Sequence, residues 1–281
     1  MPAGDVSWVA ELTNDSHTAG PGAGAPVTPF TGASRRALLR ALGAWSVVAT
    51  LPPGARSLRA TGTGPPGNSG ALGLDAHSAL IIVDVQNCFV RGGSLAVPHG
   101  EDVVPVINRL ASLFATVVAT QDWHTPAHVS FASSHPGRRP FETIDLAYGT
   151  QVLWPDHCVM GTDDAQFVHG LDTFKAQLVI RKGFHQGVDS YSAFDEADHR
   201  TPTGLAGYLT ERHIRRVFVC GLATDFCVAW TALDARKAGF DTAVIEDACR
   251  GIDLNGSLAA SWTSMTAAGV HRIRSSDFGI F

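Results

Sequence analysis

Cys227 is the residue of this 281-residue sequence whose type and position most favour nucleophilic chemistry. It lies in segment 217–240, where a short β-branched run turns at Gly221 and then changes to a helical spacing of apolar residues. Thr224 and Asp225 stand where a helix N-cap would, which puts the Cys227 thiol in the first helical turn. The free N–H groups and partial positive charge of a helix start favour a thiolate and could also hold an oxyanion. The alternative is a buried, unreactive core cysteine, so its partners decide between the two interpretations.

Two charged residues that come just after apolar strands could serve this thiol. Asp84 follows the run 79–83, and Lys182 follows the run 178–180. The carboxyl ends of parallel strands share one edge of a sheet, where ligands bind, so we expect these groups to meet there. No histidine stands at a strand end beside Cys227, which leaves Asp84 as the base that a cysteine nucleophile needs. Lys182 would hold Asp84 ionised and stabilise the thiolate, whereas the alternative is a helix-capping Asp84 and a solvated Lys182.

A second group of candidate residues lies in the long irregular segment 123–174 and at its border. Asp122 and His124 are two residues apart, His128 follows four residues later, and His157 lies further along. Carboxylate and imidazole ligands without a thiolate suit Zn²⁺, Fe²⁺ or Mn²⁺, and three protein ligands would leave open positions for water or substrate. Histidine is common in loops and the chain has 12, so this spacing alone is a weak signal.

The elements that must position these residues alternate between strands and helices. This alternation predicts a three-layer α/β fold, with a mainly parallel central sheet flanked by helices. The expected strands are 79–83, 116–120, 178–180, 216–219 and 242–245, with 270–273 as a candidate sixth. The expected helices, besides the one that holds Cys227, are 102–115 with Asp102 as N-cap, 204–213 and 256–268.

Several motifs occur in a fixed order along this predicted domain and together resemble the nicotinamidases of the isochorismatase-like cysteine hydrolase superfamily. They are LIIVDVQNCF at 80–89, GGSLAVP at 92–98, QDWH at 121–124, SFA at 130–132, LWPDHCV at 153–159, KG at 182–183, DSYSAF at 189–194 and GLATDFCV at 221–228. Within the superfamily, the DxH and WPxH elements separate nicotinamidases from relatives that keep the catalytic residues but lack the metal. The resemblance covers essentially all of 74–281.

The resemblance implies a metal-dependent cysteine amidohydrolase that converts nicotinamide to nicotinate and ammonia through a thioester. It assigns a catalytic triad, a pair of oxyanion-hole N–H groups, a substrate pocket and one divalent metal ion per chain, with Zn²⁺ first and Fe²⁺ or Mn²⁺ as alternatives. The triad is Asp84, Lys182 and Cys227; the oxyanion hole is Ala223 and Cys227, after a cis Leu222–Ala223 peptide; the pocket residues are Phe89, Trp154 and Tyr191; the metal ligands are Asp122, His124 and His157, with His128 as a further candidate. The alternatives are an amidohydrolase of the same superfamily that acts on a carbamoyl or ureido compound, and a non-catalytic pyridine-binding protein.

The cysteines give two further expectations. The chain has five, an odd number without a CxxC pair, so neither a structural zinc module nor a disulfide framework is indicated. An internal disulfide that leaves Cys227 free is compatible with this count. The resembling family usually has an acidic residue where Cys88 stands, so any local hydrogen bond of that carboxylate is absent from this chain.

The N-terminal stretch predicts export rather than part of the fold. Residues 1–57 form an extension with Arg35-Arg36, an apolar run at 41–51 and a small-residue region, as in a twin-arginine signal. Residues 58–73 are predicted to be a flexible linker, and a single hydrolase domain follows at 74–281. The apolar run is too short to span a bilayer stably. We therefore expect a periplasmic or exported protein, with a cytoplasmic one and a chance Arg-Arg pair as the alternative. The net charge of −5 gives no electrostatic support for nucleic-acid binding, and a homo-oligomer is compatible with the sequence.

Overall fold

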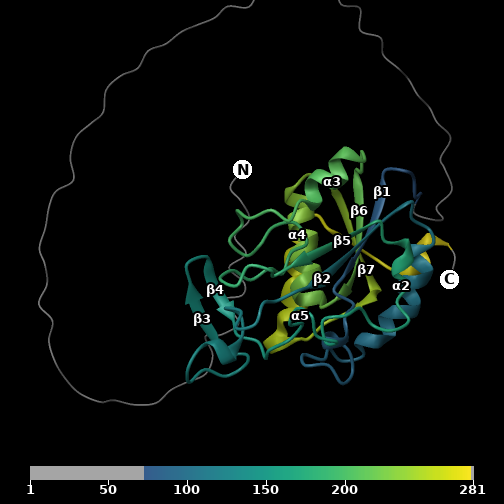
Figure 1. Ribbon diagram of the computed structural model, residues 1–281. Helices are drawn as coiled ribbons and strands as arrows, with labels where there is room; N and C mark the ends of the chain where they lie inside the picture. The colour runs from purple at the N-terminus through teal and green to yellow at the C-terminus, as the bar shows by residue number, and fades with distance from the viewer. Residues whose placement is uncertain (1–72, 280–281) are drawn as a thin grey trace, which may run out of the picture. The chain divides into compact units, whose positions relative to one another are not determined.

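The computed structural model describes residues 73–279, and its centre is a six-stranded parallel sheet (Figure 1). The strand order across the sheet is β5-β2-β1-β6-β7-β8, and all five neighbouring pairs run parallel. The strands are β1 Ser78–Val83, β2 Thr116–Asp122, β5 Leu178–Lys182, β6 Arg216–Leu222, β7 Asp241–Arg250 and β8 His271–Ile273. Every residue of β1 and β2 is buried, as expected for strands covered on both faces.

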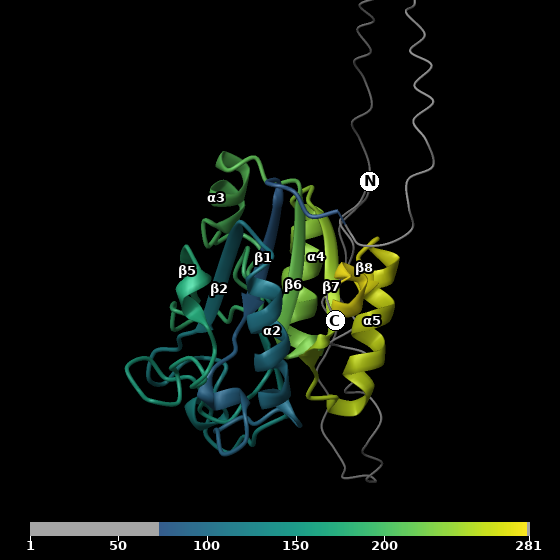
Figure 2. The same ribbon diagram turned by 90° about the vertical axis from the view of Figure 1, so that its right-hand side faces the viewer.

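Helices cover both faces of this sheet, which confirms the predicted three-layer α/β fold. Figure 1 shows α4 and α5 on one side of the sheet and α2 on the other, and Figure 2 shows α2 in front of β1 and β6. The helices are α2 Val103–Ala111, α3 Leu205–Glu211, α4 Ala229–Lys237 and α5 Ser257–Ala267. Strong amphipathic patterning in α2 buries Val103, Ile107 and Leu110 against the sheet.

Two predicted helices differ from the structure in detail. Asp102 occupies the predicted N-cap position before Val103, but its side chain makes no capping bond, and the helix ends at Ala111 rather than at 115. Cys227 lies in a π-helical turn, Thr224–Val228, which precedes α4. Asp225 is no cap there: its carboxylate accepts bonds from the backbone N–H groups of Ile252 and Asp253, at 2.9 and 2.8 Å. A tertiary contact thus takes the carboxylate that local spacing assigned to the helix end.

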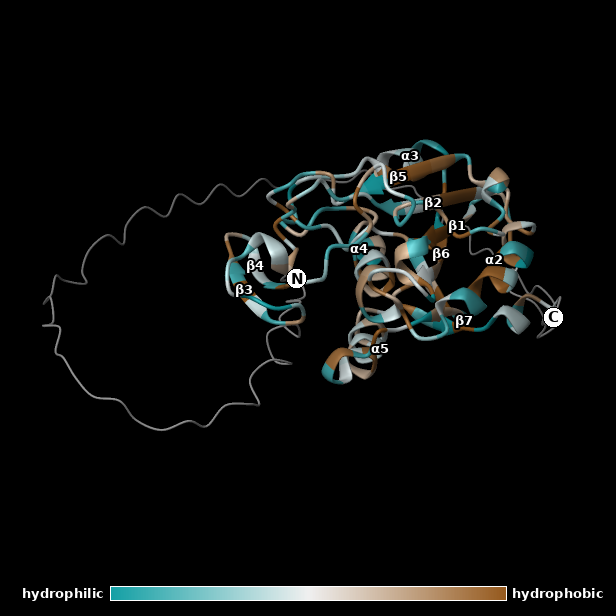
Figure 3. Cartoon of the chain, turned by 60° about the horizontal axis from the view of Figure 1, so that its bottom comes forward, coloured by the Kyte–Doolittle hydropathy of each residue, from teal (hydrophilic) through white to brown (hydrophobic). Residues whose placement is uncertain are grey.

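The segment 123–174, predicted to be irregular, contains a small antiparallel hairpin. Its strands are β3 Thr143–Leu146 and β4 Gly149–Val152, and Leu146 pairs with Gly149 beside the turn. Figure 3 shows a mixture of hydrophilic and hydrophobic colours along this hairpin, in contrast to the brown central strands. The chain leaves β4 directly toward Trp154, so the hairpin positions the loop that carries this aromatic residue.

Strand register places the chemistry-bearing residues at one edge. Asp122 and Lys182 are directly paired across β2 and β5, and Val83, the residue before Asp84, is paired with Gly221 across β1 and β6. Gly221 is required at this crossing, because it has φ +120° and an added Cβ would lie 2.0 Å from the Val83 carbonyl oxygen. The sheet itself therefore brings the ends of four strands together.

The predicted signal sequence at 1–57 and the linker at 58–73 lie outside the described residues, apart from Gly73, and stay predictions. Among residues 73–279, no helix has the length and apolarity needed to cross a membrane.

Candidate active site

Asp84, Lys182 and Cys227 meet at the carboxyl edge of the sheet. The Lys182 Nζ lies 2.7 Å from Asp84 Oδ2 and 3.4 Å from Cys227 Sγ, and it donates to the Ser190 carbonyl at 2.9 Å. All three side chains are buried, Asp84 completely. A thiol, a carboxylate and an ammonium are thus held in direct contact, which is the arrangement that nucleophilic catalysis by cysteine requires.

The backbone and the hydroxyl of Thr120 hold the Asp84 carboxylate in place. Asp84 has φ +48°, a left-handed conformation that is uncommon for a residue with a side chain, and the Thr120 hydroxyl donates to its Oδ1 at 2.6 Å. Its Oδ2 forms the ion pair with Lys182 but accepts no well-aligned hydrogen bond from the described residues. Burial raises the pKa of Asp84, which Lys182 opposes and Asp122 reinforces, so the carboxylate is a stronger base than an exposed aspartate.

Cys227 does not have the lowered pKa that its position at a helix start suggested. Burial raises the pKa of its thiol well above the usual value; Lys182 opposes this effect, while the carboxylates of Asp84 and Asp122 add to it. The desolvation of a thiolate therefore outweighs the helix dipole, whose effect on a terminal group is modest. The resting thiol keeps its proton and must pass it to a base during attack.

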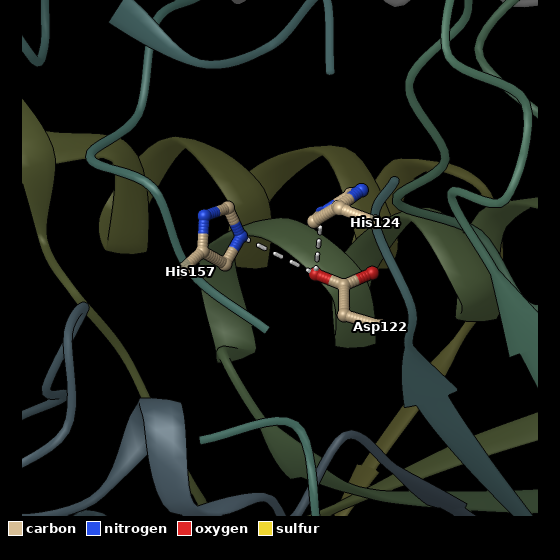
Figure 4. A group of neighbouring side chains, drawn as sticks. All are labelled: Asp122, His124 and His157. Atoms are coloured by element: carbon tan, nitrogen blue, oxygen red, sulfur yellow. Dashed lines mark ion pairs between the residues drawn. The ribbon is translucent and has the colours of Figure 1, made fainter. Parts of the chain in front are cut away.

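Asp122, His124 and His157 form a second cluster beside the first (Figure 4). The Asp122 Oδ2 lies 3.4 Å from His124 Nε2 and 3.5 Å from His157 Nε2, and all three side chains are buried. The opposite ring nitrogens face backbone carbonyls: His124 Nδ1 is 3.1 Å from the Gly183 oxygen and His157 Nδ1 is 2.9 Å from the Pro155 oxygen. A nitrogen that donates to a carbonyl carries the proton, so both Nε2 lone pairs are directed at the centre of the cluster. This pattern fits a divalent metal with two imidazole ligands and one carboxylate ligand.

Lys182 connects the two clusters. Its Nζ is 2.5 Å from Asp122 Oδ1, while the other oxygen of the same carboxylate faces the two histidines. Burial works to lower the pKa of Lys182, but the carboxylates of Asp122 and Asp84 raise it well above its usual value. Burial likewise works to raise the pKa of Asp122, but Lys182 and His124 hold it well below its usual value. Lysine and aspartate are therefore both charged in the folded protein.

His128, the further candidate ligand, is not part of the Asp122 cluster. Its ring packs on that of His124 with centroids 4.3 Å apart, and its Nδ1 is 2.8 Å from the Ser130 hydroxyl. Its Nε2 is 3.1 Å from the carbonyl oxygen of Val188. Burial and the neighbouring His124 lower the pKa of His128 to about 4. In this geometry His128 supports the ring of His124, and a role as a ligand stays a prediction.

A cavity of about 310 Å³ opens onto both clusters. Its apolar and aromatic walls are Phe89, Leu95, Trp154, Tyr191, Phe226 and Ile252. Its remaining lining is Asp122, His124, His157, Asp189, Ala223 and Cys227. This volume includes space that is open to solvent; the apolar and aromatic walls with a few polar groups suit a small aromatic molecule. All three predicted pocket residues and both predicted oxyanion-hole residues line it, and the Leu222–Ala223 peptide is cis.

The aromatic walls are held by hydrogen bonds as well as by packing. The Tyr191 hydroxyl accepts a bond from Trp154 Nε1 at 2.9 Å, and the ring of Phe226 meets Trp154 edge-on at 4.8 Å between centroids. Asp189 accepts a bond from Gln151 at 2.7 Å, which ties the cavity lining to the β3–β4 hairpin. Phe226 thus packs rather than reacts, whereas the part of Asp189 and Gln151 in this network was not predicted.

Sequence reasoning also missed residues that act behind the site. The Gln86 side chain donates to the Asp122 carbonyl and accepts from the Asp122 N–H, both at 2.8 Å, which fixes the end of β2 against β1. Gly183 has φ +67°, and an added Cβ would lie 2.5 Å from the His124 ring. Gln86 lies in the motif VDVQN and Gly183 in the motif KG, and these motifs were the only sequence feature that could have indicated a role for them. The contacts that explain this role are visible only in the fold.

Comparison with known proteins agrees with this geometry. A family model described as the isochorismatase domain matches residues 78–277. A nicotinamidase of Acinetobacter baylyi is 60% identical over 199 residues, which is 71% of this chain and 93% of that protein. A nicotinamidase of Escherichia coli is 43% identical over 196 residues, covering 68% of this chain and 92% of that protein.

Solved structures show the same relationship. A nicotinamidase/pyrazinamidase of Acinetobacter baumanii has a TM-score of 0.72 at 62% identity and covers 72% of this chain and 98% of its own. PnC1 of L. infantum in complex with nicotinate has a TM-score of 0.65 at 42% identity, covering 74% and 98%. A pyrazinamidase of Pyrococcus horikoshii in complex with zinc has a TM-score of 0.57 at 33% identity, covering 70% and 99%. The chain therefore belongs to the isochorismatase family, as its motifs predicted, and it is an amidohydrolase.

Proposed function

We propose that this amidohydrolase is a nicotinamidase, which hydrolyses nicotinamide to nicotinate and ammonia with Cys227 as nucleophile. The observation that carries the proposal is the cavity, which has the Cys227 thiol and the Asp122–His124–His157 cluster in its lining and aromatic walls between them. A planar pyridine amide has one end that a thiol can attack and a ring nitrogen that a metal can bind. Relatives named nicotinamidase and the related PnC1 structure with nicotinate support the same substrate.

The first half of the reaction forms a thioester. Asp84 takes the proton from the Cys227 thiol as the sulfur attacks the amide carbon. The raised pKa of the thiol keeps its proton on sulfur until that moment, and the raised pKa of Asp84 makes the carboxylate a stronger base for this step. The backbone N–H groups of Ala223 and Cys227 stabilise the negative oxygen of the tetrahedral intermediate. Asp84 then gives the proton to the departing nitrogen, the C–N bond breaks and ammonia leaves.

The second half uses the same groups in reverse. Asp84 removes a proton from a water molecule, the hydroxide attacks the thioester carbon, and the C–S bond breaks. Cys227 regains a proton from Asp84 and nicotinate leaves. Lys182 stays protonated throughout, because two carboxylates hold its charge, and it offsets the negative charge that develops on sulfur 3.4 Å away.

Asp122, His124 and His157 would hold one divalent cation, with Zn²⁺ as the first candidate and Fe²⁺ or Mn²⁺ as alternatives. Their buried lone pairs converge as described above, and the related Pyrococcus structure contains zinc. When bound, such a cation supplies an open coordination position for a ring nitrogen. Phe89 and Trp154 would flank the ring, and Tyr191 would fix the indole through its hydroxyl.

The test is ammonia release from nicotinamide by the purified chain and by two cysteine variants. Cys227→Ala should remove activity, while the matched control Cys220→Ala, a buried free cysteine on β6, should retain it. Normal turnover by Cys227→Ala would refute the assignment of the nucleophile. Ammonia release from a ureido compound but not from nicotinamide would show instead a different amidohydrolase of the family.

A metal-removal experiment tests the second cluster separately. A chelator should abolish turnover, and added Zn²⁺, Fe²⁺ or Mn²⁺ should restore it, with metal content measured by mass spectrometry. Full activity in metal-free protein would contradict the proposed role of Asp122, His124 and His157.

We also propose that the protein is exported to an oxidising compartment. The support is the twin-arginine pattern at 34–57 together with a disulfide between Cys88 and Cys158, a bond that persists mainly outside the cytosol. Cell fractionation should find the chain in the periplasm or medium, shortened by removal of the predicted signal sequence. Full-length protein confined to the cytosol would contradict export.

A further inference from the structure

A disulfide joins Cys88 and Cys158, 70 residues apart in the sequence, directly behind the candidate active site. Both cysteines are completely buried, and the other three cysteines of the chain are free. The bond covalently links the 3₁₀ turn after β1 to the loop between β4 and β5. The proposed reaction does not use it.

Each half of the disulfide is adjacent in sequence to a residue of the cavity wall. Cys88 precedes Phe89, and Cys158 follows His157; the rings of Phe89 and His157 contact each other edge-on with centroids 5.6 Å apart. The Cys158 carbonyl also accepts the backbone N–H of His124 at 3.1 Å. The bond is therefore connected to one aromatic wall and to two of the three residues of the candidate metal cluster.

Hydrogen bonds that do not involve sulfur also join the segments on either side of the disulfide. Cys88 N–H donates to the Asp164 carbonyl at 2.8 Å, and Cys158 N–H donates to the Asp164 carboxylate at 3.1 Å. Asn87 N–H donates to the Gln166 carbonyl at 2.9 Å. These bonds do not depend on sulfur, so a chain without the disulfide should fold while its two segments gain freedom to shift. Loss of the groups that orient metal-binding side chains typically weakens metal binding about 10–100-fold, and we expect an effect of this order when His157 and His124 lose this support.

We propose that the Cys88–Cys158 disulfide is a positioning element of the active site: it fixes Phe89 and His157 relative to each other, so that metal and substrate bind fully only to the oxidised chain. This inference rests on the proposed function for the role of Phe89. Forming the bond removes two protons and two electrons from the two thiols, which a disulfide oxidant such as oxidised glutathione accepts while it is reduced to two thiols. The position that is usually acidic in the family thus carries a covalent link in this chain.

Counting thiols tests the bond itself. Unreduced protein, denatured and alkylated, should react at three cysteines, and protein reduced beforehand should react at five. Five reactive thiols in protein prepared with oxidised glutathione would overturn the proposal.

Comparing matched variants tests the positioning role. Cys88→Ala/Cys158→Ala should bind Zn²⁺ at least about 10-fold more weakly than the wild type in competition with a chromophoric chelator, and its KM for nicotinamide should rise. The control Cys220→Ala/Cys249→Ala removes two other buried sulfurs and should retain Zn²⁺ affinity and KM. The wild-type chain, prepared with and without the oxidant, gives the same comparison if the double variant does not fold.

The outcomes separate positioning from general stabilisation. A lower midpoint of thermal unfolding with unchanged Zn²⁺ affinity and unchanged KM at a temperature where the protein is folded would refute the proposal. Oxidation-dependent Zn²⁺ affinity in a chain that does not hydrolyse nicotinamide would support the metal half of the proposal and refute the proposed function instead.

Discussion

Replacing Gly183 with alanine tests whether the backbone behind His124 controls the candidate metal cluster. Gly183 is buried directly after β5, has φ +67° and offers its carbonyl to His124 Nδ1 at 3.1 Å. An alanine Cβ at this position would lie 2.5 Å from both Nδ1 and Cε1 of the His124 ring, where real Cβ atoms essentially never come. Because the obstacle at Gly183 is the His124 ring itself, the imidazole must move, and its packing on the His128 ring at 4.3 Å between centroids must change with it.

The Gly183→Ala substitution should have two effects, one on stability and one on metal affinity. An L-residue in the left-handed conformation costs about 1–2 kcal/mol, which should appear as a lower free energy of unfolding. Displacement of the His124 ring and loss of its bond to the Gly183 carbonyl should weaken metal binding about 10–100-fold, as loss of outer hydrogen bonds to metal-bound histidines generally does. The expected change in metal-binding free energy is thus about 1.4–2.7 kcal/mol.

The assay is Zn²⁺ affinity by competition with a chromophoric chelator, together with urea unfolding of the metal-free protein. The matched control is Gly187→Ala, four residues further along the same segment, where an added Cβ has no atom within 4 Å. The control should retain Zn²⁺ affinity and stability. Equal Zn²⁺ affinity in Gly183→Ala and Gly187→Ala would refute the reasoning that the Gly183 backbone orients His124.

Three further predictions concern neighbouring residues. Lys182→Met leaves the buried carboxylates of Asp84 and Asp122 without their cation and should lower the free energy of unfolding by about 3–5 kcal/mol in urea; a loss below about 1 kcal/mol would contradict the buried ion pairs. Tyr191→Phe removes the hydroxyl that accepts the hydrogen bond of Trp154 Nε1. The free energy of unfolding should fall by about 1–3 kcal/mol and KM for nicotinamide should rise, whereas an unchanged KM would contradict the proposed role of Tyr191 in the aromatic wall of the cavity. His128, with a pKa of about 4, stays neutral in the native state while the unfolded state protonates below about pH 6.5. Unfolding free energy should therefore fall as the pH drops from 6.5 to 4, by up to about 3 kcal/mol, and His128→Gln should flatten this part of the curve.

The strands could be predicted from the sequence because each is a short apolar run in a buried parallel sheet. Their carboxyl ends were placed too early, since β2 and β5 continue through Gln121-Asp122 and Arg181-Lys182, whose polar side chains resemble loop residues. Pairing with the neighbouring strand, which local sequence does not encode, keeps these residues in the sheet. The β3–β4 hairpin was missed for a related reason, because each strand is only four residues long and has at most two apolar residues, too short a pattern to stand out in an irregular segment.

Sequence reasoning could identify the residues of the candidate site but not their electrostatic state. The type of Cys227 and its distance from a strand end indicated a nucleophile, yet the expected pKa change had the wrong direction. The helix start is a local feature, whereas the burial that raises the thiol pKa arises from segments far away in the sequence. The Cys88–Cys158 bond is similar: its partners are 70 residues apart, and five cysteines allow several pairings.

The register between β2 and β5 is the feature that makes one site out of two clusters. Asp122 and Lys182 are direct partners, so their side chains emerge on the same face and the two charges meet.

A slip of one residue would place Lys182 on the opposite face of the sheet and leave Asp84 and Asp122 as two buried carboxylates without a cation. Since burial alone raises the pKa of such carboxyls, they would take up protons and could not serve in the proposed roles of base and metal ligand. Gln86, which follows β1, holds Asp122 with two hydrogen bonds of 2.8 Å, so the end of β2 is fixed relative to the segment that carries Asp84. The proposed base Asp84 and the candidate metal cluster are therefore positioned by the same contacts between neighbouring strand ends.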